Sequence, residues 1–415
     1  MVEDALPAIS SSGSCVVAAD YDQDGDLDLF VGGRVRPTDF PMPPASYLLE
    51  NEGGTFTDVT ERDMGEPTSF GMVSAALWTD YDRDGQVDLL VASEWEELQP
   101  YRNKQGRFQR EEILAGKSGW WNSLYGSDLD RDGDIDYVLG NLGLNSRFRA
   151  SEAEPIRMYA KDFDRNNETD AIVTFTQADT EYVYHSRDAL NDQIIAMSKR
   201  FGSYDTYAQA SFNTVLLPHE REGAQVWQTT ELRNTLVIRE EGDNRFQPLS
   251  TSLQLAPITS IQTYPSTNGA ELIMVGNFYE PETALGPYDA FTGAIANFGS
   301  TSESVQPLNI PGDARSLASL TLNTQKQIYL VGRNQGELMV CEPEVLPKGY
   351  FTQLQPLDFY AEIKLNNGQL YREEFYYGAG YLSQSSRSLF IPENAQEVTI
   401  YRFDRQSRKL DLLDL

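Results

Sequence analysis

DYDQDGDLD, at residues 20–28, is an acidic nonamer that recurs along this chain. Close copies are DYDRDGQVD at 80–88 and DLDRDGDID at 128–136, and a more divergent copy is DFDRNNETD at 162–170. Each copy places carboxylate or amide side chains at positions 1, 3, 5 and 9, with a turn-forming residue at position 6. This spacing is typical of a calcium loop, and its recurrence indicates a repeat fold.

Calcium is coordinated by six to eight oxygens in loose geometry, whereas magnesium keeps its waters and fits an all-protein loop less well. Glycine at position 6 permits the positive φ of a sharp turn, and Asn167 is the next most tolerant residue. Like charges ~4 Å apart repel by about 1 kcal/mol even in water, so the converging acids favour a bound cation. The sequence predicts three calcium sites and allows a fourth. The candidate ligands are Asp20, Asp22, Asp24, Asp26, Asp28, Asp80, Asp82, Asp84, Gln86, Asp88, Asp128, Asp130, Asp132, Asp134, Asp136, Asp162, Asp164, Asn166, Glu168 and Asp170.

Two other interpretations of the nonamers are weaker. A single Asp-Gly run is often only a solvated turn, but three intact copies in the same phase argue against that. An EF-hand needs a glutamate at position 12 and flanking helices, whereas position 12 here is Val31, Val91 or Leu139. The apolar, β-branched runs on both sides of each loop predict strands, so each loop joins two strands.

The repeat predicts an all-β fold, a β-propeller of about six or seven four-stranded blades. The turn residues at position 6 are 34 to 60 residues apart except for one longer gap, for which we expect a degenerate blade plus an insertion. Residues 188–210 show no strand alternation and are predicted to be helical, while 236–238 and 246 would belong to the hidden blade. A fifth copy keeps its turn at Asn268-Gly269 and a sixth ends at Gly332, but both lack ligands, so no ion is expected there.

After about residue 346 the repeat pattern ends and a short β-rich tail follows. Prolines mark a linker, and Asn366-Asn367-Gly368 between alternating strands predicts a hairpin. We therefore expect two domains, a propeller over 1–345 and a small β module over 346–415.

The composition limits the classes of partner and the setting. The net charge of −30 disfavours nucleic acid and anionic membranes as partners. The sequence contains no run of ~18 apolar residues, so no transmembrane helix is predicted. Residues 1–14 lack a secretory leader, so we expect a fragment of a longer exported protein or a removed leader. Cys15 and Cys341 allow a ring-closing bridge, but two free thiols are favoured.

The acidic loops, with the strand and glycine that follow them, resemble FG-GAP/VCBS repeats, which also build integrin α-chain propellers. The tail, around EFYYGAGYLSQSSR at 374–387, resembles the ASPIC/UnbV module that often follows such propellers. The resemblance implies a calcium-bearing propeller in an exported, Bacteroidetes-type bacterial protein with a cell-surface or adhesive role. It does not imply a reaction.

No catalytic motif is visible. His185 and His219 are the two histidines, neither lies in a zinc-protease motif, and no nucleophile elbow or phosphate loop occurs. We therefore expect a non-enzymatic, calcium-binding protein at the cell surface or outside the cell, with a protein or glycan ligand. The alternative is a carbohydrate-binding or glycan-degrading propeller, in which Trp95, Trp120 and Trp121 would stack on sugars, although blade packing is favoured for them. A third class is a structural part of an exported assembly.

Overall fold

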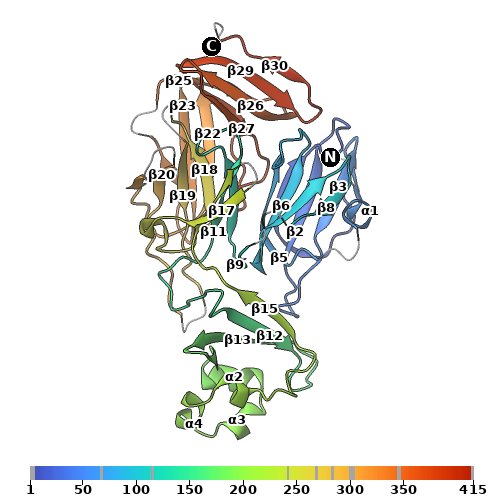
Figure 1. Cartoon of the computed structure of the whole chain (residues 1–415), viewed down its shortest axis with the longest axis vertical. Helices are drawn as coiled ribbons and strands as arrows, with labels where there is room; N and C mark the ends of the chain where they lie inside the picture. The colour runs from blue at the N-terminus through green and yellow to red at the C-terminus, as the bar shows by residue number, and fades with distance from the viewer. Residues whose placement is uncertain are drawn as a thin grey trace.

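The computed structural model describes residues 5–65, 69–112, 114, 116–240, 243–266, 270–281, 285–298, 304–343 and 347–412. Strands dominate, and successive antiparallel sheets stand side by side along the chain (Figure 1). The all-β, propeller-like fold expected from the repeats is confirmed. The predicted boundary between residues 345 and 346 and the turn at Asn268-Gly269 lie outside the described residues.

The first two sheets each contain an acidic loop between their first and second strands. Both have the simple order of a blade, in which each strand pairs with the next one along the chain. A short helix, α1 (Thr60–Met64), follows the first sheet, and β9 (Gly119–Trp120) pairs with β6 at the side of the second. The strands are β1 (Ser12–Ala19), β2 (Asp28–Val35), β3 (Tyr47–Glu52) and β4 (Thr55–Asp58), then β5 (Met72–Thr79), β6 (Asp88–Glu96), β7 (Gln99–Asn103) and β8 (Phe108–Arg110).

The third sheet is interrupted by a long insertion. Its inner strands β10 (Ser123–Ser127) and β11 (Asp136–Gly140) carry the third acidic loop, and its outer strands are β16 (Thr235–Glu240) and β17 (Asp243–Pro248). Strand β11 pairs directly with β16, with Val138 opposite Leu236. The expected hidden blade around residues 236–238 and 246 is therefore wrong, because these residues complete the third sheet.

The insertion forms a sheet of its own at the end of the molecule away from the C-terminal strands (Figure 1). The fourth acidic loop joins its strands β12 and β13, so it lies outside the succession of blades. The prediction of helix within 188–210 is confirmed, since four short helices pack their apolar sides against this sheet. The elements are β12 (Ile156–Lys161), β13 (Asp170–Gln177), β14 (Thr180–Val183), β15 (Gln225–Thr229), α2 (Arg187–Gln193), α3 (Met197–Arg200), α4 (Tyr204–Ala208) and α5 (Phe212–Val215).

Two further sheets without acidic loops continue the succession. The fourth sheet has four strands and the fifth has three in the described residues, and a 3₁₀ turn at Thr251–Leu253 precedes them. Five sheets thus follow one another in this part of the chain, fewer than the six or seven blades expected. The strands are β18 (Ser260–Tyr264), β19 (Glu271–Val275), β20 (Ala294–Asn297), β21 (Ser304–Pro307), β22 (Asp313–Asn323), β23 (Lys326–Asn334) and β24 (Met339–Cys341).

Apolar cross-strand rows form the cores between neighbouring sheets. In the first sheet Val17, Phe30 and Leu48 lie side by side, are at most 1% exposed and pack against the second sheet. Burying one such side chain contributes roughly 1.5–3 kcal/mol, so these rows hold the blades against one another.

The C-terminal strands form two small sheets that cover one end of the molecule (Figure 1). The predicted hairpin is confirmed, and its second strand ends at Glu374, where the chain leaves the sheet. Their shared core includes Ile363, Leu389 and Ile400, all fully buried. The strands are β25 (Gly349–Gln353), β26 (Asp358–Leu365), β27 (Leu370–Glu374), β28 (Ser388–Pro392), β29 (Ala395–Arg402) and β30 (Ser407–Lys409).

Residues 375–387, which we call the crossing segment, run between the first and fifth sheets. The amide of Ala18 in β1 donates to the carbonyl of Tyr377, and the amide of Ser386 donates to the carbonyl of Ser319 in β22. Inner strands of several sheets line one small cavity together with this segment. The crossing segment therefore links the two ends of the succession of blades.

Cys15 and Cys341 are free thiols.

Candidate metal centres

The four acidic loops share one backbone conformation. They are called loop 1 (residues 20–28), loop 2 (80–88), loop 3 (128–136) and loop 4 (162–170). Position 6 has positive φ in all of them, from 67° at Asn167 to 99° at Gly25, as the sequence predicted. Position 4 is also left-handed in each, with φ between 61° and 66°, although glutamine or arginine stands there. No residue type at position 4 predicts this second turn, because glutamine and arginine rarely adopt such a conformation. Two left-handed residues curl each nonamer so that its odd-numbered side chains converge.

In every loop, three carboxylates can place one oxygen each within 4.8 Å of the others. Calcium–oxygen distances are about 2.3–2.6 Å, so two ligands on opposite sides of one ion are separated by up to about 5 Å. The observed spacing is therefore compatible with one shared ion per loop. The clusters are Asp20, Asp22 and Asp28; Asp80, Asp82 and Asp88; Asp128, Asp130 and Asp132; and Asp162, Asp164 and Asp170.

The position-1 aspartates of loops 1 to 3 are buried, and each has one oxygen without a hydrogen-bond partner. Oδ2 of Asp20, Asp80 and Asp128 accepts the amide of the position-6 glycine at 3.0–3.2 Å. Oδ1 of each is buried and has no hydrogen-bond partner. A buried, unpaired carboxylate oxygen is costly, and a cation would satisfy it.

The position-9 aspartates fasten each loop to its sheet. In loops 1 to 3, Oδ1 accepts an amide from the next strand, namely that of Asn51, Asn103 or Arg239, at 2.7–2.8 Å. Burial, together with the neighbouring acids, raises the pKa of Asp28 to about 8 and that of Asp88 to about 9. A cation at the loop centre would offset the repulsion between these carboxylates and favour their ionised form.

Positions 5 and 7 mainly stabilise the turn. The side-chain oxygen at position 5 accepts the amide of position 7 in every loop, at 2.7–2.9 Å. At position 7, the Asp26 carboxylate accepts the amide of Gly53, and the Asp134 carboxylate pairs with Arg83 at 2.8 Å. Asp132 at position 5 also belongs to the carboxylate cluster of loop 3, and the assignment of side chains at positions 5 and 7 as ligands stays a prediction.

The donor atoms of the four loops fit calcium. The clusters contain only carboxylate oxygens, which hard divalent cations prefer, and no histidine or cysteine belongs to them. In loop 2, the guanidinium of Arg102 in β7 already pairs with the Asp82 carboxylate at 2.6 Å. If calcium binds, the position-1 and position-3 carboxylates would hold it, together with the position-9 carboxylate in loops 1, 2 and 4 and the position-5 carboxylate in loop 3. The two positive charges of the ion would offset the repulsion between these carboxylates.

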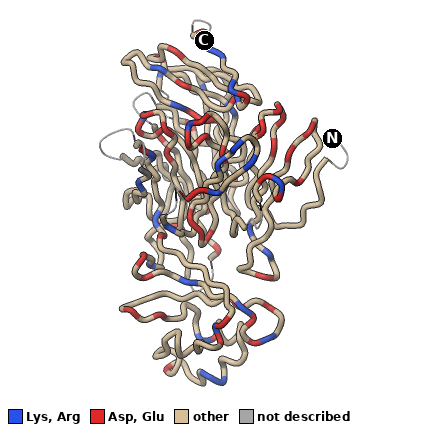
Figure 2. The backbone as a smooth tube through the Cα atoms, turned by 45° about the vertical axis from the view of Figure 1, so that its right-hand side comes forward, with Lys and Arg blue, Asp and Glu red and all other residues tan. Residues whose placement is uncertain are grey.

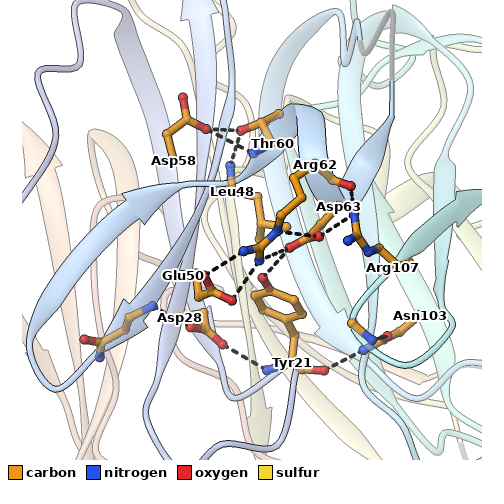
Figure 3. Close-up of polar contacts among 12 residues, drawn as sticks. Tyr21, Asp28, Leu48, Glu50, Asp58, Thr60, Arg62, Asp63, Asn103 and Arg107 are labelled. Carbon is orange, nitrogen blue, oxygen red and sulfur yellow. Dashed lines mark hydrogen bonds and ion pairs between the residues drawn. The ribbon is translucent and has the colours of Figure 1, made fainter.

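A polar network stabilises loop 1 from behind (Figure 3). The Tyr21 hydroxyl donates to Asp63 of α1 at 2.9 Å, and the Tyr21 amide donates to Asp28. Asp63 is 4% exposed and pairs with Arg62 at 2.5 Å and Arg107 at 3.0 Å. The second residue of the loop is thus anchored to the helix that follows the first sheet.

Asn51 and Asn103 are structural residues that the sequence analysis missed. Each lies at or next to the end of the third strand of its sheet. Each accepts the amide of the glycine three residues later and donates to the loop carbonyl before position 9. Asn103 also donates to the carbonyl of Tyr21 at 2.7 Å, which connects the second sheet to loop 1 (Figure 3). The repeated Asn-x-x-Gly spacing was the signal available.

Replacing Asn103 with alanine is expected to destabilise the protein by about 3 kcal/mol, because two buried hydrogen bonds and one partly buried hydrogen bond are lost. Asn51→Ala is the matched control, since it removes the same local contacts without a link to a neighbouring loop, and it should cost about half as much. Thermal melts in saturating calcium measure both. Equal effects would contradict a connecting role for Asn103.

With this geometry established, the chain can be compared with known families. A family model described as an FG-GAP-like repeat matches residues 20–91 and 80–139. Residues 20–139 contain FG-GAP-like repeats. The matched FG-GAP-like segments span the first three acidic loops and the strands after them, while loop 4 lies outside the match. A search of curated proteins found no match.

The other residues considered from the sequence lie in packed or peripheral places. Trp95 and Trp121 are 6% and 0% exposed, and Trp120 packs on Trp95 with ring centroids 5.0 Å apart. Trp95 and Trp121 are core residues, as favoured from the sequence, and Trp120 is partly buried against the core that contains Trp95. His185 accepts the amide of Val173, and His219 is exposed.

Proposed function

We propose that this protein is a calcium-stabilised, non-enzymatic interaction protein that works at the cell surface or outside the cell. The observation that carries the proposal is the recurrence of one geometry, in which buried carboxylate oxygens without partners converge in loops of FG-GAP-like repeats. The ions would hold the fold, and the surfaces of the blades would contact the partner. Among the described residues the helices are short, and none has the length and apolarity to cross a bilayer.

The partner is proposed to be a protein or a glycan. Asp and Glu outnumber Lys and Arg 63 to 33, and Figure 2 shows acidic residues along the whole molecule, including the insertion and the C-terminal sheets. A nucleic acid would be repelled by this charge. The likeness of the C-terminal sheets to an ASPIC/UnbV module and the bacterial origin remain proposals from the sequence.

Calorimetric titration of the metal-free protein with calcium is expected to show three or four sites. Asp20→Asn should remove one of them, because it takes a charge from a position-1 ligand of loop 1. Asp205→Asn is the matched control, since Asp205 is exposed on α4 outside every cluster, and it should leave the stoichiometry unchanged. Absence of calcium binding by the unmodified protein would refute the proposal.

The non-enzymatic part of the proposal needs a separate test. Incubation of the protein with a panel of polysaccharides, followed by a reducing-sugar assay, should show no release of sugar. Released sugar would overturn this part, while binding to glycans without turnover would identify a glycan as the partner.

A further inference from the structure

Strand β27 of the C-terminal sheets lies directly on loops 2 and 3. The Arg372 guanidinium lies 3.0 Å from Asp80 Oδ2, and the Arg372 amide donates to Asp128 Oδ2 at 2.9 Å. In the opposite direction, the amide of Asp80 donates to the Glu374 carboxylate at 3.2 Å. Two position-1 aspartates, one from each loop, are thus held by a strand far away in the sequence.

These contacts are buried. Asp80 and Asp128 are 2% exposed, and Arg372 and Glu374 are 7% and 6% exposed. Arg372 also pairs with Glu374 at 3.2 Å and stacks on the Tyr360 ring at 3.7 Å. Because removing one partner of a buried ion pair leaves an uncompensated charge, this cluster is stable only while β27 stays in place.

The two oxygens of each held carboxylate have different roles. Oδ2 receives the contacts from β27 and from the position-6 glycine, whereas Oδ1 is buried without a hydrogen-bond partner. The strand therefore fixes the rotamer of Asp80 and Asp128 and leaves one oxygen of each available to a cation. Supporting contacts of this kind raise metal affinity, because the ligand is already ordered before the ion binds.

Loops 1 and 4 provide an internal comparison. Asp20 in loop 1 is held by the amide of Gly25, and Asp162 in loop 4 is held by the amides of Asn166 and Asn167. These contacts come from the same nonamer, so the position-1 residues of loops 1 and 4 do not depend on the C-terminal sheets.

We propose that Arg372 and Glu374 are positioning residues that couple loops 2 and 3 to the C-terminal sheets. Cation binding at these two loops and packing of β27 against them stabilise each other. Loops 1 and 4, in contrast, bind their cations independently of β27. Coupling of this kind is reciprocal by thermodynamic necessity, so it can be measured from either side. The inference rests on the proposed calcium function and adds a partner within the chain for two of its sites.

The test uses the charge-balanced double variant Arg372→Met/Glu374→Gln. Arg372→Met alone would remove a clamp and also a positive charge near the ion, and these changes act in opposite directions. The double variant removes the side-chain ion pairs that hold Asp80 and keeps the net charge, while the main-chain amide of residue 372 can still donate to Asp128. The matched control is Lys409→Met/Glu397→Gln, an exposed pair in the same sheets with a 2.7 Å separation.

Calcium titration followed by glycine-selective NMR reports loops 1, 2 and 3 separately through Gly25, Gly85 and Gly133. In the double variant, affinity at Gly85 is expected to fall at least 10-fold and affinity at Gly133 to fall less, because the Arg372 main-chain amide still faces Asp128, while Gly25 keeps its affinity. The control should leave all three unchanged. Equal weakening at all three glycines would indicate a general folding defect and overturn the coupling, as would unchanged affinity.

Hydrogen exchange measures the reciprocal effect. Asp80→Asn/Asp128→Asn should speed exchange at residues 370–374, whereas Asp162→Asn should not. If the unmodified protein binds no calcium, the proposed function itself fails. If it binds calcium but exchange at 370–374 is the same in both variants, only the coupling fails.

Discussion

Chelation with EGTA is expected to lower the melting temperature of this protein by on the order of 10 °C. A site that binds only the folded state contributes about 2.7 kcal/mol at a free ligand concentration of 100 times Kd, so four sites together contribute roughly 11 kcal/mol. For a chain of 415 residues, 1 kcal/mol corresponds to about 1 °C. Differential scanning calorimetry with and without EGTA measures the difference.

Metal replacement identifies the ion that matters. Adding excess calcium after chelation should restore the melting temperature, whereas the same concentration of magnesium should restore little of it, because magnesium dehydrates reluctantly. A melting temperature that does not respond to EGTA would show that packing alone holds the loops.

Gly378→Ala is expected to destabilise the protein by about 2–6 kcal/mol. Gly378 lies in the crossing segment with φ of 80°, and an added Cβ would lie 1.9 Å from the carbonyl oxygen of Val16. The variant would combine left-handed strain with a clash against backbone that cannot move aside, at about 1–3 kcal/mol each.

Gly368→Ala separates the two contributions. Gly368 has a similar φ of 86° in the C-terminal hairpin, but nothing lies within 4 Å of its added Cβ. It should therefore cost only the backbone strain, about 1–2 kcal/mol. Melting temperatures of the two variants in calcium measure the difference, and equal losses would contradict the close contact between the crossing segment and β1.

The sequence predicted much of the candidate sites because their determinants are local. Nine residues contain the ligand positions 1, 3, 5 and 9 and the turn at position 6, and the flanking strands pair across the loop they share. The left-handed residues at position 4, such as Gln23 and Arg83, were missed because their conformation is imposed by the loop rather than favoured by the residue type.

The blades were harder to count because strand pairing across a long insertion has no local signal. Strand β16 looked like the start of a new blade, yet it pairs with β11 and completes the third sheet. The fourth nonamer looked like a blade of its own, yet it belongs to the inserted sheet.

By itself, the sequence determined the acidic loops, their oxygen-only donors and the strands around them, since each is encoded within a few consecutive residues. Only the tertiary structure decided that Arg372 and Glu374 reach loops 2 and 3 and that residues 375–387 join the first and fifth sheets. The contacts of Arg372 and Glu374 with Asp80 join residues nearly 300 positions apart. Their formation depends on how the sheets pack, a property that no short stretch of sequence contains.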